Sequence, residues 1–182
     1  TSETLLYYDT DVPWNWQRTE NARIVMYYSD IDLAAAQLIA SKGAQQLITL
    51  EQRLGGIVPA PVYLFIYPDL SEMVASIRMH NGQLGDWITA FSVPESNLVY
   101  LSYSTEAAEQ RILGDWGHEA THLVVFSAGG AHVPSWLNEG LALVESSDSD
   151  SALNNIMGQA INNGVLLSVD SLCSTSLLGM PP

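Results

Sequence analysis

GHEATHLVVFSAGGAHVPSWLNEGLALVE, residues 117–145, contains two histidines four residues apart and a glutamate beside the first. On a helix, residues four apart lie on one face with Cβ atoms about 5–6 Å apart, so His118 and His122 can both point at one metal ion. Glu119 is rotated by about 100° from His118, which suits contact with a metal-bound water better than direct ligation. The stretch therefore predicts a metal-binding helix with Glu119 as a general base.

Two buried core histidines beside a glutamate that reaches solvent are the alternative interpretation of the same residues. An ionised glutamate on a helix as apolar as THLVVF is costly unless a cation compensates it, which favours the metal site. A catalytic zinc ion takes three protein ligands and leaves a fourth position for water, so a third ligand must lie elsewhere. The two candidates are His132 in the loop AGGAHVP and Glu139 in a second predicted helix.

The HExxH pattern followed by SWLNEGLA resembles the gluzincin zinc metallopeptidases, and within them the peptidase MA-like family. The resemblance covers the core of the domain, residues 115–145. It implies that Glu139 is the third zinc ligand beside His118 and His122. It also implies a mechanism, in which Glu119 takes a proton from a zinc-bound water that attacks a peptide carbonyl.

The resemblance implies a zinc endopeptidase that acts on peptide or protein substrates. The aminopeptidase branch is disfavoured because AFSVPESN does not match its amine-binding GxMEN strand. A noncatalytic, zinc-stabilised domain that binds peptides or a partner is the alternative, because the Tyr or His that usually stabilises the oxyanion is missing after Glu139. That group would lie in a missing C-terminal part, or among the candidates Tyr100, Tyr103, His80 and His132.

The run NLVYLSY at 97–103 alternates between apolar and polar residues, which predicts an edge strand with one solvated side. In the group that the chain resembles, such a strand runs antiparallel to the bound peptide and holds it by main-chain hydrogen bonds. The resemblance therefore implies that Tyr100 and Leu101 contact the substrate.

Asp115 lies one helical turn before His118. It is a candidate to hydrogen-bond one of the ligand histidines and so to orient its ring. The alternative is a solvated helix residue that has no part in the site.

Strand-like runs fill the first hundred residues and helices the rest, which predicts an α+β fold rather than a doubly wound parallel sheet. We expect a single domain over 1–182, with a mixed sheet and a long packed helix over 1–103 and a mainly helical active-site part over 104–182, similar to a thermolysin-like core. The chain stops at GMPP without a closing helix, so we expect a piece of a longer protein. Strands are expected at 4–9, 22–30, 61–68 and twice within 87–103, and helices at 31–54 (with Asp30 as N-cap and Gly55 as stop), 69–80, 105–129, 134–146 and 150–163.

The charge balance excludes two classes of partner. With 20 acidic and 6 basic residues, the formal net charge is -14, which argues against binding to nucleic acid or anionic membranes. The apolar runs are far shorter than the roughly 20 residues of a membrane span. Cys173 is the only cysteine, so no internal disulfide forms. Thr1 at the start is compatible with a removed signal peptide and an extracytoplasmic or secreted location.

Overall fold

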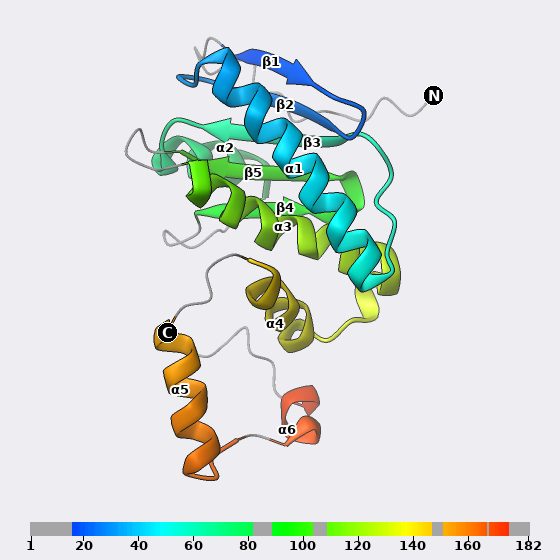
Figure 1. Cartoon of the computed structure of the whole chain (residues 1–182), viewed down its shortest axis with the longest axis vertical. Coiled ribbons are helices and arrows are strands. Elements are labelled where there is room, and N and C mark those ends of the chain that lie inside the picture. The colour runs from blue at the N-terminus through cyan, green and yellow to red at the C-terminus, as the bar shows by residue number, and fades with distance from the viewer. Residues whose placement is uncertain (1–15, 82–88, 104–108, 147–150, 167, 175–182) are drawn as a thin grey trace.

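A computed structural model of the chain describes residues 16–81, 89–103, 109–146, 151–166 and 168–174. Five strands form one sheet in the order β1-β2-β3-β5-β4 (Figure 1). The strands are β1 (Gln17–Glu20), β2 (Ile24–Tyr28), β3 (Val62–Tyr67), β4 (Ala90–Val93) and β5 (Leu98–Ser102). The helices are α1 (Leu33–Leu54), α2 (Leu70–Asn81), α3 (Glu109–Gly129), α4 (Ser135–Glu145), α5 (Ser151–Asn162) and α6 (Val169–Ser174), with short 3-10 turns η1 (Pro94–Ser96) and η2 (Gly130–His132).

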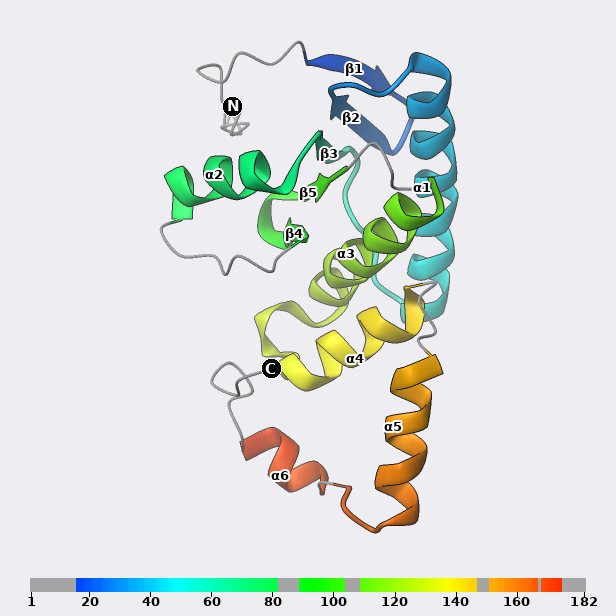
Figure 2. The same ribbon diagram turned by 90° about the vertical axis from the view of Figure 1, so that its left-hand side faces the viewer.

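The centre of the sheet is parallel and its two ends are antiparallel. β2, β3 and β5 run parallel, while β1 pairs antiparallel with β2 and β4 antiparallel with β5. Helices α1 and α3 cover one face of the sheet and α2 packs on the other (Figure 2). β3 is buried along almost its whole length, as expected for a parallel strand covered on both faces. The α+β expectation, with a mixed sheet, a long helix and a mainly helical C-terminal part, is confirmed.

Helix α1 begins at a different cap from the expected one. Asp32, not Asp30, is the N-cap, and its side chain accepts a hydrogen bond from the backbone N–H of Ala35 at 2.9 Å. Asp30 has a φ of 57°, whereas an N-cap residue takes the extended conformation. The helix ends at Gly55, whose φ of 79° is the left-handed conformation that glycine adopts most readily. The predicted stop is therefore confirmed.

Close contacts from α1 and from Gly56, just after its end, hold α3 in place. The indole Nε1 of Trp116 donates a hydrogen bond to the carbonyl oxygen of Gly43 at 3.1 Å, and Trp116 is fully buried. Gly56 lies so close to α3 that an added Cβ would stand 2.2 Å from the carbonyl oxygen of Val124. These contacts fix the helix that carries His118 against the core.

Among the described residues, the expected elements are present with small shifts of boundary, and one expectation about topology is wrong. The strand at 97–103 is not an edge strand, because β5 pairs with β3 on one side and with β4 on the other. The edge position belongs to β4. The polar strand β1 and the short helix α6 were not expected, while the strand predicted at 4–9 lies outside the described residues. Within the described residues, no helix is both long and apolar enough to cross a membrane.

Candidate metal centre

The two histidines of the HExxH pattern lie on one face of α3. Their ring centroids are 4.9 Å apart and the rings are almost perpendicular. The side chain of His118 is 25% exposed and that of His122 is 11% exposed, so both border solvent although Glu119, Ala120 and Thr121 between them are buried. The predicted pairing of His118 and His122 on one helical face is what the structure shows.

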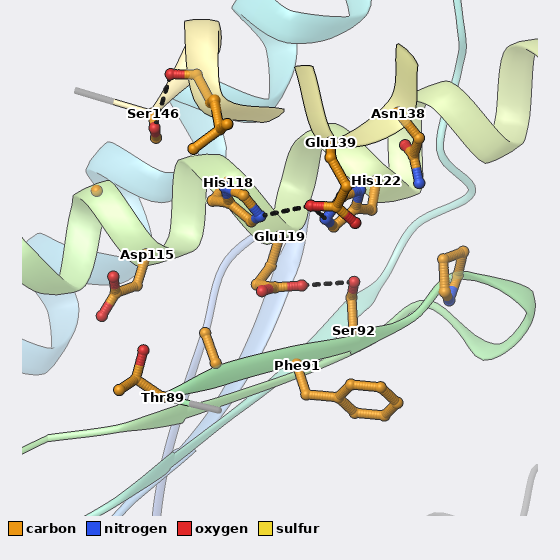
Figure 3. A pocket seen from close by; sticks show the side chains of 14 residues that line it. Thr89, Phe91, Ser92, Asp115, His118, Glu119, His122, Asn138, Glu139 and Ser146 are labelled. Atoms are coloured by element: carbon orange, nitrogen blue, oxygen red, sulfur yellow. Dashed lines mark hydrogen bonds and ion pairs between the residues drawn. The ribbon is translucent and has the colours of Figure 1, made fainter. Parts of the chain in front are cut away.

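Helix α4 folds back against α3 and brings Glu139 to the histidines. Its Oε2 atom lies 3.5 Å from Nε2 of His118 and 3.8 Å from Nε2 of His122 (Figure 3). The chain reverses through η2, where Gly130 has a φ of 63°, and Pro134 at the N-cap position then starts α4. The Gly-rich loop after α3 therefore makes the return that places a distant carboxylate between two imidazoles.

Glu119 points from α3 toward the sheet. Its side chain lies between the histidines and β4, and its Oε2 accepts a hydrogen bond from Oγ of Ser92 at 2.6 Å (Figure 3). Both residues are buried, Glu119 at 6% exposure and Ser92 at 9%. His118, Glu119 and His122 form a group that could hold a metal ion, since one ligand atom from each lies within 4.8 Å of the others.

The electrostatics of the site follow from these contacts. The hydrogen bond to Glu139 raises the pKa of His118 above its usual 6.5, although burial acts in the opposite direction. The same hydrogen bond lowers the pKa of Glu139 below its usual 4.5. Burial raises the pKa of Glu119, and the hydrogen bond from Ser92 and the charges of the histidines oppose that rise. Glu139 therefore tends to stay ionised, whereas Glu119 tends to accept a proton.

A cleft of about 590 Å³ opens over these side chains. Its floor is the motif face of α3, one wall is α4, and the other wall is the edge strand β4 with the residue before it. The lining residues are Thr89, Ala90, Phe91, Ser92, Pro94, Gly114, Asp115, His118, Glu119, His122, Asn138, Glu139, Leu143 and Ser146. The candidate centre is therefore open to a ligand along the exposed edge of the sheet.

Asp115 lines this cleft one helical turn from His118, and its charge contributes to the raised pKa of His118. Tyr100 and Leu101 do not line it. They are buried at 5% and 1% exposure on opposite faces of the sheet, because their strand is an interior one. β4 instead occupies the edge beside the cleft.

Of the residues considered for oxyanion stabilisation, Tyr100, Tyr103 and His132 are not among those that line the cleft. His132 is exposed in η2, on the connection between α3 and α4. The side chain of His80 lies outside the described residues.

Two contacts of the site, from Ser92 and from Arg53, were not predicted from the sequence. Ser92, which donates a hydrogen bond to Glu119, lies in the strand AFSV between Phe91 and Val93. Strand alternation directs its side chain inward, and a hydroxyl at an inward position was the signal that could have indicated a polar contact there. The second contact is an ion pair of 2.7 Å between Arg53 of α1 and Glu145 of α4. It ties the helix that carries Glu139 to the body of the domain, and no local sequence pattern indicates it.

Residues 42–177 match the family model of the Peptidase MA superfamily. The chain belongs to this superfamily. The match begins within α1 and includes both motif helices, in agreement with the resemblance seen in the sequence. A comparison with curated proteins found no match.

Membership of the Peptidase MA superfamily indicates a metallopeptidase-like function with protein or peptide substrates. Members are typically metal-dependent, and this chain presents a His-Glu-His group of the required kind. The family assignment and the cleft geometry therefore point to the same face of the molecule.

Proposed function

We propose that this protein is a gluzincin-type zinc metallopeptidase that hydrolyses internal peptide bonds. In this proposal His118, His122 and Glu139 hold the zinc ion and Glu119 is the general base. The single observation that carries the proposal is the approach of one oxygen of Glu139 to Nε2 of both histidines. Three donors from two helices thus converge on one point at the floor of the cleft.

The two distances from Glu139 to the histidines are close to those of a tetrahedral zinc site. With zinc–ligand bonds of about 2.0–2.2 Å, two ligand atoms of a tetrahedral site lie about 3.3–3.5 Å apart. The distance from Glu139 Oε2 to His118 Nε2 is 3.5 Å, and the distance to His122 Nε2 is 3.8 Å. Only a few tenths of an ångström separate this arrangement from the expected geometry.

Two other residues compete for the third ligand position, and the geometry favours Glu139 over both. Glu119 is close to the histidines, but it is buried and its Oε2 is already engaged by Ser92. His132 is exposed in η2 and does not line the cleft. One oxygen of Glu139 lies within 3.8 Å of both imidazoles, and its lowered pKa keeps the carboxylate in the ionised form that binds a cation.

Two buried polar atoms beside the site have no hydrogen-bond partner within the part of the chain that the structure describes. A histidine that gives Nε2 to a metal carries its proton on Nδ1, and that N–H requires an acceptor. Among the described residues, Nδ1 of His122 and Oδ1 of Asn138 are buried without hydrogen-bond partners. One is a potential donor and the other an acceptor, and they lie on the two helices that carry the proposed ligands.

A bound zinc ion supplies Lewis acidity and lowers the pKa of a water molecule to about 7. The chain's own residues then move the protons. Glu119 lies between the histidines and β4, and burial raises its pKa toward the range in which a carboxylate accepts and returns a proton. It takes the proton of the attacking water and delivers it to the nitrogen of the departing amine. The new C–O bond forms first, and the peptide C–N bond breaks once its nitrogen has received the proton.

The edge strand β4 takes the substrate-binding role that was expected of β5. It is the last strand of the sheet, with β5 on one side and the cleft on the other. A strand in that position offers main-chain N–H and C=O groups to an extended peptide, which can add to the sheet as a further strand. A peptide held in this way lies across the histidines and Glu119, as an endopeptidase requires.

Cleavage of a complex peptide mixture by the zinc-loaded protein tests the proposal, with products identified by mass spectrometry. Glu119→Gln should reduce hydrolysis by at least about a hundredfold while zinc stays bound, because general base catalysis contributes about 10²–10⁴-fold. Glu109→Gln removes an exposed glutamate from the same helix and should leave hydrolysis unchanged. A wild-type protein that binds zinc and cleaves nothing would favour the noncatalytic binding domain instead.

A further inference from the structure

The edge strand β4 directs alternate side chains to two different environments. Phe91 and Val93 pack with the aromatic cluster on the α2 side of the sheet. Ala90 packs against the main core, on the side of α1 and α3. Ser92 also faces α3, where a strand of this kind usually places an apolar residue.

The hydroxyl of Ser92 has one specific partner in this apolar setting. It donates to Oε2 of Glu119 over 2.6 Å, and both residues are buried. A buried carboxylate without a hydrogen bond is costly, and a donated hydrogen bond also limits the rotation of its oxygens. The bond joins the wall of the cleft to the proposed general base on its floor.

We propose that Ser92 is a positioning residue that holds Glu119 in its productive orientation. With Oε2 engaged by the hydroxyl, the other oxygen of the carboxylate is left for proton transfer. Because Ser92 belongs to the strand on which the peptide is proposed to dock, one element sets both the register of the substrate and the orientation of the base. This inference rests on the proposed peptidase function.

Kinetics of Ser92→Ala test the positioning role. The variant should lower kcat about ten- to hundredfold, the scale of a misoriented catalytic group, with KM and zinc content near wild type. Ser92→Thr keeps a hydroxyl at a strand position and should recover most of the loss. Ser29→Ala removes a similarly buried hydroxyl after β2, away from the cleft, and should change neither kcat nor KM. A Ser92→Ala enzyme with wild-type kcat would overturn the proposal.

A second readout does not depend on activity. In metal-free protein, Ser92→Ala should lower the urea midpoint of unfolding in the wild-type background and much less in the Glu119→Ala background, because the hydrogen bond is already lost there. Equal shifts in both backgrounds would show that the hydroxyl does not hold Glu119 and would overturn the proposal. If the zinc-loaded wild type cleaves no peptide, the peptidase assignment fails, while this cycle still decides whether Ser92 binds Glu119.

Discussion

Oε2 of Glu139 on α4 lies 3.5 Å from Nε2 of His118 on α3. The contact joins two helices that the chain separates by a Gly-rich turn, and it brings a carboxylate to a pair of histidines at the floor of a cleft. Each partner alters the other, since the contact raises the pKa of His118 and lowers that of Glu139.

In chelator-treated protein, the imidazole of His118 should titrate above pH 6.5, mainly because of its hydrogen bond to Glu139. Glu139→Gln removes the acceptor charge, so the titration should move to lower pH. Since zinc competes with this proton, zinc affinity should rise with pH through the His118 titration. NMR of the imidazole C–H resonances measures the titration in both proteins. An identical His118 midpoint in both would contradict the contact.

The Arg53–Glu145 pair should stabilise the position of α4. The side chain of Glu145 is 6% exposed and that of Arg53 is 59% exposed, so the exposure of the pair is intermediate between that of a buried and that of a surface ion pair. Arg53→Ala leaves the carboxylate without this partner and should lower the free energy of unfolding by about 1–2 kcal/mol, below the cost for a fully buried pair. It should also weaken zinc binding, because Glu139 is on the same helix. Urea denaturation and a zinc competition assay measure the two effects.

Lys42 and Glu109 provide the matched control for that experiment. Their ion pair joins α1 to α3 and is exposed on both sides, at 52% and 39%. Lys42→Ala should change the free energy of unfolding by less than about 1 kcal/mol and leave zinc affinity unchanged. If Arg53→Ala and Lys42→Ala had the same small effect on both quantities, α4 would not depend on its ion pair.

Gly56→Ala should be strongly destabilising, because the new Cβ would stand 2.2 Å from the backbone oxygen of Val124. Backbone cannot yield as a flexible side chain can, so α1 and α3 would have to separate, at a cost of about 1–3 kcal/mol. Thermal unfolding measures the change. Gly158→Ala on α5 is the control, because its new Cβ would meet nothing within 4 Å. This variant should be as stable as wild type or slightly more stable, since alanine is favoured over glycine inside a helix by about 0.5–1 kcal/mol. A Gly56→Ala protein as stable as wild type would refute the close packing of Gly56 on α3.

The helices and buried strands were predictable because their signals are local. The apolar run of β3, the spacing along α1 and the left-handed stop at Gly55 each depend on residues within a few positions. The pairing of His118 and His122 was predictable for the same reason, since helical geometry alone places them on one face. The family resemblance supplied the expectation about Glu139, which local geometry left open against His132.

The order of strands was not predictable, because it depends on partners that are distant in sequence. An alternating pattern such as that of β5 fits an edge strand, but β4 turns back through η1 and covers that edge. The assignment of Tyr100 and Leu101 to the substrate site rested on that edge. Two further contacts also join residues that are distant in sequence: Ser92 with Glu119, and Arg53 with Glu145. Such contacts depend on the packing of the elements and could not be predicted from local sequence.

Zinc binding by the wild type, Glu139→Gln and His132→Ala decides whether Glu139 is the third zinc ligand. Elemental mass spectrometry gives the stoichiometry, and competition with a chelating indicator gives the affinity. We expect one zinc per wild-type chain and per His132→Ala chain. Glu139→Gln should bind zinc more than about a hundredfold more weakly, because even an outer hydrogen-bond partner of a ligand is worth about 10–100-fold. Wild-type affinity in Glu139→Gln would rule out Glu139 as the third ligand, and a wild type that binds no zinc would rule out the zinc site.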